Sequence, residues 1–283
     1  MTERQTEIAS NSGRPVRART LAKLTALPNV LIAIISGTIV VSYGLLCLLS
    51  LGSGWTFPNV LPDRMTLAPW KNFLSDRDGI LTAMLLSTGL SLFVGCVATL
   101  CGLLIGRTIR RTQSTTLRFL VYLPFVLAPV IAGVCLYDLL VRLQLAGTFM
   151  GVILSQLVFA ISFASVYFSE LWSRRTDRLE SLVRNLGGSS WSVWQHVVIP
   201  QCSGLIAVCF LQTCIYSWLD YGLVSVIGGG SVQTLTTRMF SYIREASVNQ
   251  AAQSALVLLT PAIVGLVVTA LFYFRRTTEV PQP

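Results

Sequence analysis

Residues 80–106 read ILTAMLLSTGLSLFVGCVATLCGLLIG, and no charged side chain interrupts them. An α-helix rises about 1.5 Å per residue, so this stretch is long enough to cross the hydrocarbon core of a bilayer, which is roughly 30 Å thick. Further apolar runs of spanning length lie at residues 29–51, 119–140, 148–169, 204–227 and 254–274. We therefore expect an all-α membrane protein with six transmembrane helices.

Three prolines lie inside these runs: Pro124 and Pro129 in the third, and Pro261 in the sixth. Proline removes one backbone hydrogen bond from a helix, but a spanning helix tolerates it where neighbouring helices or water satisfy the freed carbonyl. We expect all three prolines to kink their helices without breaking them.

The charge composition supports a membrane location. Charged residues make up 12% of the 283 residues, whereas soluble domains usually contain about 25%. A net charge of +9 is also compatible with nucleic-acid binding. However, the basic residues cluster in short gaps between long apolar runs, which is not the pattern of a groove that follows phosphates. We therefore expect membrane lipid, and no nucleic acid, among the partners.

The cysteines and the N-terminus indicate neither a cofactor nor a cleaved signal. The seven cysteines lie within or at the edge of apolar runs, without CxxC or Cys/His spacing, so we interpret them as packing residues and expect no metal. Polar residues fill positions 1–28, and the first apolar run is too long for the core of a signal peptide. We interpret residues 1–28 as an N-terminal tail.

The distribution of Lys and Arg predicts the orientation. Fifteen of the 21 basic residues lie in segments 1–28, 107–118, 170–203 and 275–283, and the other six lie in segments 52–79, 141–147 and 228–253. Short loops on the cytoplasmic side of a membrane usually contain more Lys and Arg than those on the outer side. Both termini are therefore expected in the cytoplasm, with one transmembrane domain at residues 29–274 between tails 1–28 and 275–283.

Two segments assigned to the outer face are long enough to carry structure. Residues 52–79 contain Trp55, Phe57 and Trp70, and residues 228–253 open with three glycines. Aromatic residues that flank a span usually anchor it at the membrane interface. Anchoring and docking of an external partner both remain open for these segments.

Residues 170–203, between the fourth and fifth predicted helices, carry the most specific pattern. Apolar residues at i, i+3, i+4 and i+7 predict one face of a short helix: Leu179, Leu182, Val183 and Leu186. Gly187-Gly188 would end that helix, and Ser189 or Ser190 would cap a second helix on which Trp191, Trp194 and Val198 share a face. We expect this hairpin on the cytoplasmic face, where it offers a surface to another protein or, alternatively, lies on anionic lipid.

This segment resembles the permease subunits of binding-protein-dependent ABC importers. Their cytoplasmic signature is Glu-Ala-Ala, three residues, Gly, nine residues and Ile-x-Leu-Pro, and four residues of this chain fall on that spacing: Gly187, Val197, Ile199 and Pro200. The signature's glutamate falls on Ser181 and its alanines fall on Leu182 and Val183. Glu180 is one place early, which turns it about 100° around a helix.

The resemblance implies a function and a set of partners. In that family the segment is a coupling helix that seats in a cleft of a separate ATPase subunit. The residues that the resemblance suggests for coupling are Glu180, Ser181, Leu182, Val183, Leu186, Gly187 and Pro200. Either Glu180 replaces the usual carboxylate with a reoriented contact, or coupling depends on the apolar side chains. The resemblance also implies a second permease subunit, identical or homologous, an extracytoplasmic solute-binding protein, and a bacterial inner membrane.

Asp220 lies in the fifth predicted run and Asp138 near the end of the third. Charged groups inside spans usually face a cavity or a partner. For Asp220 this predicts either contact with a cationic substrate or an outer gate on the substrate pathway, or else a structural role between helices. The stretch that follows Asp220 loosely resembles the permeases for polyamines, ferric iron, thiamine and aminoethylphosphonate.

Other functions find less support in the residues. The sequence GLLIGRT at 102–108 has the wrong spacing for a phosphate-binding loop, so ATP hydrolysis is expected of another chain. His196 is the single histidine and no catalytic group is identified, so we do not expect an enzyme. An ion-gradient-driven secondary transporter is the alternative, although no convincing internal repeat is present. Gly102 and Gly106 form a GxxxG pair, which permits close helix packing and suggests a dimer seam.

Overall fold

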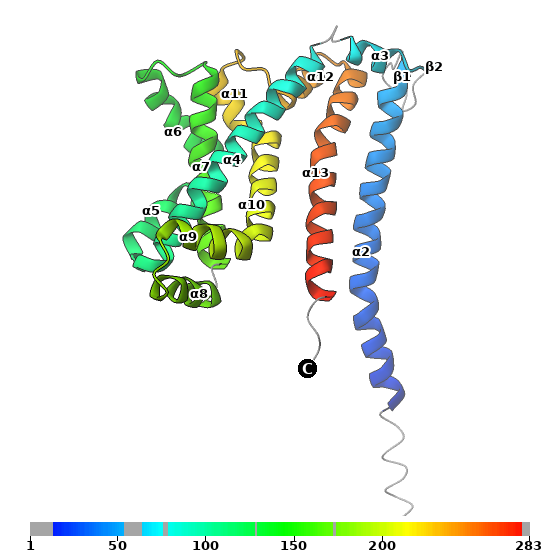
Figure 1. The fold of residues 1–283 in the computed structure, drawn as a ribbon. Helices are drawn as coiled ribbons and strands as arrows, with labels where there is room; N and C mark the ends of the chain where they lie inside the picture. Colours follow the sequence, from blue (N-terminus) through cyan, green and yellow to red (C-terminus); the bar gives the residue numbers. More distant parts are fainter. Residues whose placement is uncertain (1–13, 54–63, 76–78, 128, 172–173, 279–283) are drawn as a thin grey trace, which may run out of the picture.

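The computed structural model describes residues 14–53, 64–75, 79–127, 129–171 and 174–278 (Figure 1). The elements in chain order are α2 (Arg14–Leu51), β1 (Gly52–Ser53), β2 (Arg64–Met65), α3 (Ala68–Leu74), α4 (Ile80–Thr112), α5 (Thr115–Val126), α6 (Pro129–Arg142), α7 (Phe149–Leu171), α8 (Arg174–Asn185), α9 (Ser190–Val193), η1 (Trp194–Val198), α10 (Ile199–Leu219), α11 (Gly222–Gly228), α12 (Leu235–Arg244) and α13 (Val248–Thr278). The two short strands pair antiparallel. Trp55 and Phe57 lie outside the described residues, so their role stays a prediction.

Within the described ranges, five helical stretches are long and apolar enough to cross a membrane: Ile32–Leu51, Ile80–Thr112, Phe149–Glu170, Ser190–Leu219 and Val248–Gly265. Many apolar side chains on these helices stay exposed, as expected where lipid is the solvent. Apart from the two-residue strands, the described part of the chain is all-α, and its apolar helices make this a multi-pass membrane protein, as predicted at that level.

The predicted third span consists of two helices. α5 ends at Val126, Leu127 is extended (φ −79°, ψ 137°), and α6 begins at Pro129. Helices of 12 and 14 residues are each too short to cross a core of roughly 30 Å. The expectation of a kink at Pro129 is therefore wrong, because proline there occupies the first position of a new helix, where no backbone N–H is needed. Pro124 and Pro261 do lie inside their helices, α5 and α13.

The predicted fifth span also has different bounds. Its helical stretch starts at Ser190, passes through the π-helical segment η1 and ends at Leu219. Asp220 follows with extended backbone (φ −70°, ψ 115°), and α11 is a separate seven-residue helix. Asp220 therefore lies at the end of a spanning helix and not in its interior.

The described ends of the chain lie on one side. α2 begins at Arg14, inside the segment interpreted as a tail of residues 1–28. The first residues of α2 and the last residues of α13 lie at the same end of the molecule as α8 and α9 (Figure 1). This arrangement agrees with a topology that places the termini and segment 170–203 on one membrane face. That this face is cytoplasmic stays a prediction.

α4 packs along α7 and α10 at the centre of the molecule. Gly102 and Gly106 make the close approach to α7 possible. A Cβ on Gly102 would clash with Ala164, and a Cβ on Gly106 would lie 2.8 Å from the Cβ of Phe168. The GxxxG pair thus joins two helices of the same chain, and the suggested dimer seam is wrong for these glycines because α7 already covers them.

Hydrogen bonds fix the other end of the bundle, where α11 and α12 lie. The hydroxyl of Ser87 on α4 accepts a hydrogen bond of 2.8 Å from the backbone N–H of Leu235 at the start of α12. The indole N–H of Trp218 on α10 donates to the carbonyl of Leu258 on α13 at 3.0 Å. These buried bonds hold α12 and α13 against the central helices.

Candidate functional site

The hairpin of α8 and α9 turns at Gly187. The backbone N–H of Gly188 donates to the carbonyl of Val183 (2.9 Å), and that of Gly187 donates to the carbonyl of Arg184 (3.0 Å). Gly187 has a φ of +82°, which completes a Schellman motif at the end of α8. The hydroxyl of Ser189 then accepts from the N–H of Ser192 at 3.3 Å and caps α9. The predicted glycine stop and serine cap are both present.

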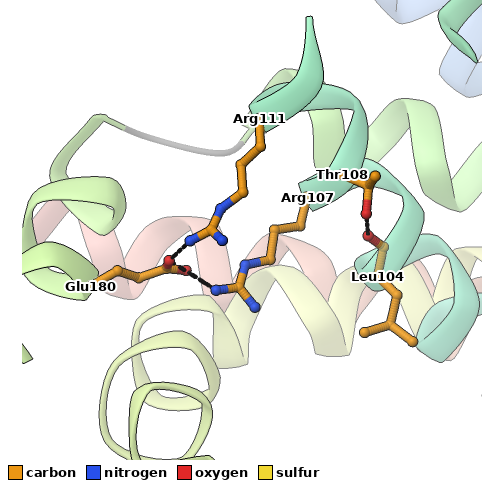
Figure 2. Close-up of polar contacts among 5 residues, drawn as sticks. All are labelled: Leu104, Arg107, Thr108, Arg111 and Glu180. Carbon is orange, nitrogen blue, oxygen red and sulfur yellow. Dashed lines mark hydrogen bonds and ion pairs between the residues drawn. The ribbon is translucent and has the colours of Figure 1, made fainter. Parts of the chain in front are cut away.

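Glu180 points from α8 to the end of α4 (Figure 2). One guanidinium nitrogen of Arg107 lies 2.8 Å from Glu180 Oε1 and donates to Oε2, also at 2.8 Å. Arg111, one helical turn further along α4, contacts the same carboxylate. The Glu180 side chain is 3% exposed. The carboxylate is therefore enclosed within this chain, between two arginines that the sequence reasoning did not single out.

Arg107 connects the carboxylate to the second helix of the hairpin. Its guanidinium carbon lies 4.8 Å from the ring centroid of Trp194, a distance typical of a cation–π contact. Trp194 in turn packs against an apolar cluster that includes Val193, Val198 and Phe168. The hairpin is thus attached to α4 by charge and to α7 and α10 by apolar packing.

Three large apolar side chains of the hairpin remain exposed. The exposed fractions are 55% for Leu182, 86% for Leu186 and 73% for Trp191. Leu179 and Val183 are half-buried, so the predicted apolar face of α8 is divided between two sides. The cause is the position of Glu180, whose ion pairs turn the side between Glu180 and Val183 toward α4. We call Leu182, Leu186 and Trp191 the exposed apolar patch.

The apolar face predicted for the second helix of the hairpin is not found as a single face. Trp191, Trp194 and Val198 do not share one environment, because Trp191 is exposed, Trp194 half-buried and Val198 buried. Val193 and Val197 supply the other buried side chains of this stretch. The π-helical segment η1 contributes to this difference, since a wider turn shifts which residues share a side.

The remaining predicted residues line the same hairpin or its junction with α10. Ser181 is exposed, and its hydroxyl donates to the carbonyl of Arg178 at 2.7 Å. Pro200 is exposed in the first turn of α10. Ser181, at the position of the signature's glutamate, therefore faces outward, whereas Glu180 faces α4, as expected for neighbours about 100° apart around a helix.

Asp220 lies far from this hairpin, at the junction of α10 and α11. Its Oδ2 accepts from the side-chain amide of Gln156 on α7 at 2.9 Å, and its Oδ1 accepts from the N–H of Leu223 at 3.2 Å. Ser217 donates to the amide oxygen of the fully buried Gln156 at 2.7 Å. Both carboxylate oxygens therefore accept bonds that join α7, α10 and α11. This geometry favours the structural role for Asp220, while its place on a substrate pathway stays a prediction.

The arginine pair had one signal in the sequence. Arg107 and Arg111 are four residues apart directly after an apolar run, so they share a helix face at the membrane boundary. Comparison of the chain with protein-family models and with curated proteins finds no match in either. The function must therefore be inferred from the residues and their geometry.

Proposed function

We propose that the chain is a permease subunit of an ATP-driven, binding-protein-dependent importer in a bacterial inner membrane. The spanning helices form half of the path for a small solute, and a second permease chain forms the other half. An external solute-binding protein delivers the solute to the face that carries α11 and α12. The chain has no phosphate-binding loop, so a separate ATPase subunit supplies the energy by docking on α8 and α9.

The observation that carries this proposal is the two-sided hairpin. One side holds the buried Glu180, and the other presents Leu186 and Trp191 at 86% and 73% exposure. A helix that merely lies on lipid separates an apolar from a polar face. The exposed side of α8 instead mixes apolar residues with Arg178, Ser181 and Arg184. Exposed apolar side chains beside polar ones are compatible with a protein–protein interface.

The ion pairs give the hairpin a mechanical role. A force applied to α8 by the ATPase reaches α4 through Glu180 and Arg107, because this contact is short and buried. α4 packs along α7 and α10, so its movement carries the central helices with it. Rigid-body movement of packed helices is one way in which a local displacement changes access to a distant site. In this account each ATPase cycle reorients the solute path.

The proposal is tested by recovery of partners from the native membrane. The tagged chain is extracted in mild detergent, and the co-purifying proteins are identified by mass spectrometry. We expect an ATPase subunit with the unmodified chain and its loss in the double variant Leu182→Ala/Leu186→Ala, which truncates two residues of the exposed apolar patch.

The matched control is Leu139→Ala/Leu143→Ala. This pair has the same spacing and is also exposed, at 51% and 57%, but lies at the end of α6, away from the hairpin. The control variant should retain the ATPase. If well-folded chain yields no ATPase even after chemical cross-linking, the coupling role is wrong, and ion-gradient-driven transport becomes the function to test.

A further inference from the structure

A polar pocket lies between α11 and α12, at the opposite end of the molecule from α8 and α9 (Figure 1). Its volume is about 200 Å³. A water molecule occupies about 30 Å³ in the liquid, and pockets for drug-sized ligands begin at about 300 Å³. The pocket therefore has room for a small polar group together with a few waters.

One face of α12 supplies most of the polar lining. Thr237, Ser241 and Arg244 follow the i, i+4, i+7 spacing of a helix face, and Arg238 lies beside them. The ring of Phe240 on the same helix lies 4.1 Å from that of Tyr221, centroid to centroid, at the start of α11. Because this contact ties α12 to α11, the pocket is formed without a ligand.

The pocket carries two positive charges. No carboxylate is among its described lining residues, and none of the ion pairs in the described part of the chain involves Arg238 or Arg244. Arg238 Nε is buried and has no hydrogen-bond partner among the described residues. A buried donor of this kind costs free energy unless something accepts its hydrogen bond.

The start of α4 adds to this positive potential. A Cβ built on Gly79 would lie 3.1 Å from the terminal nitrogen of Arg238, so the guanidinium lies against the residue that precedes α4. The N-terminus of a helix carries a partial positive charge. Arg238 beside a helix N-terminus, with Arg244 in the lining of the same pocket, favours an oxyanion, and the planar fork of arginine suits phosphate and phosphonate oxygens in particular.

We propose that this pocket binds the phosphate-like oxyanion group of the small, water-soluble solute that the chain carries. The transport part of this inference rests on the proposed function, whereas anion binding is a property of the chain alone. The hydroxyl groups of Thr237 and Ser241 also line the pocket, but they donate to the carbonyls of Thr234 and Thr237 on their own helix, so the guanidinium groups supply the donors for the oxyanion. Asp220 is not part of the lining, and its carboxylate is already bonded by Gln156.

Calorimetric titration of the full chain, purified in a neutral detergent, tests the site. The probes are inorganic phosphate and methylphosphonate. We expect saturable binding that weakens as salt is raised, and a loss of affinity of about tenfold or more in Arg238→Gln and in Arg244→Gln. Arg142→Gln is the matched control, because Arg142 is already paired with Asp138, at 3.0 Å, and lies outside the pocket. It should bind like the unmodified chain.

Several results would overturn the site. They are the absence of saturable binding by the folded chain, and equal binding by all three arginine variants. A lipid headgroup offers the same chemistry, so binding seen only in nanodiscs of anionic lipid, and not with the soluble probes, also contradicts the inference.

Internal pairing is a separate arm of the test. Asp76 and Asp78 precede Gly79 in the sequence and lie outside the described residues. If the probes bind only to the double variant Asp76→Asn/Asp78→Asn and not to the unmodified chain, these aspartates neutralise Arg238 and Arg244, and the inference is wrong. Phosphate binding without recovery of an ATPase would leave the pocket in place and reject the importer, whereas the reverse result would reject the pocket alone.

Discussion

Glu180 and Arg107 are separated by 73 residues, yet their charged groups lie 2.8 Å apart where α8 meets the end of α4. The carboxylate is 3% exposed and the Arg107 side chain 12% exposed, so water screens this contact little. Arg111, at 48% exposure, closes the outer side. A buried group of this kind stabilises the arrangement only while its partners are present, because removing one partner leaves an uncompensated charge.

The first prediction concerns that carboxylate. Glu180→Gln keeps the shape of the side chain but leaves Arg107 without its counter-charge, so we expect the free energy of unfolding to fall by about 3 kcal/mol. Thermal unfolding in detergent measures the loss, and hydrogen exchange should become faster in α8. Glu245→Gln, at an exposed residue, is the control and should leave both readouts unchanged. Equal stability of the two variants would contradict a clamp between α8 and α4.

The second prediction separates backbone strain from steric effects at Gly187. Nothing lies within 4 Å of a Cβ added there, but the φ of +82° disfavours residues with a side chain. We expect Gly187→Ala to lower the free energy of unfolding by about 1–2 kcal/mol and Gly187→Asn to lower it by less, because Asn tolerates the left-handed region. Chemical unfolding measures both. If Asn costs as much as Ala or more, the turn does not depend on this backbone conformation.

The same turn should affect transport. Gly187→Pro removes the N–H that donates to Arg184 and cannot adopt a positive φ, so it distorts the hairpin. We expect loss of uptake with normal membrane insertion, measured by solute accumulation and by the amount of chain in the membrane. Normal uptake by this variant would count against a coupling role for the hairpin.

The third prediction concerns the packing of α4 on α7. Gly102→Ala adds a methyl group that clashes with Ala164, so we expect it to lower the free energy of unfolding by about 1–3 kcal/mol. Gly89→Ala on the same helix meets nothing within 4 Å and should be neutral or stabilising, because alanine favours helix more than glycine does. Thermal unfolding compares the two. A reversed order would mean that α4 and α7 are not in close contact at Gly102.

The fourth prediction distinguishes the two roles of Asp220. Asp220→Asn keeps the acceptor for the N–H of Leu223 and loses the one for Gln156, whereas Asp220→Ala removes both. If the Asp220 side chain has a structural role, the Asp220→Ala variant should lose about 1 kcal/mol of unfolding free energy, and the Asp220→Asn variant should retain solute uptake. Uptake and unfolding are measured on both variants. Loss of uptake by the Asp220→Asn variant at unchanged stability would instead place the Asp220 charge on the substrate pathway.

Local features of the fold followed from the sequence, and the pairing of distant residues did not. The stop at Gly187 and the cap at Ser189 depend on neighbouring backbone groups, so their residue types were sufficient to predict them. The contact between Glu180 and Arg107 depends on how α8 meets α4, which no local pattern contains. The division of the predicted apolar face of α8, with Val183 half-buried and Leu186 exposed, follows from that contact and was not predicted for the same reason.

The prolines show the same limit. Pro124 and Pro129 lie five residues apart in one apolar run, yet Pro124 stays inside α5 and Pro129 begins α6. Both lack a backbone N–H, and each restricts the residue before it. Which of the two breaks the helix depends on the packing of α5 on α7 and of α6 on α11, which involves residues distant in the chain.

The most direct test of the coupling role is site-specific photo-cross-linking in the native membrane. A photo-reactive amino acid replaces Leu186, which is 86% exposed in the exposed apolar patch, and a parallel chain carries it at Leu143, which is 57% exposed at the other end of the molecule. We predict an adduct with an ATPase subunit from position 186 and none from position 143. Adducts at position 186 that contain only lipid, in a chain that is folded and inserted, would contradict it.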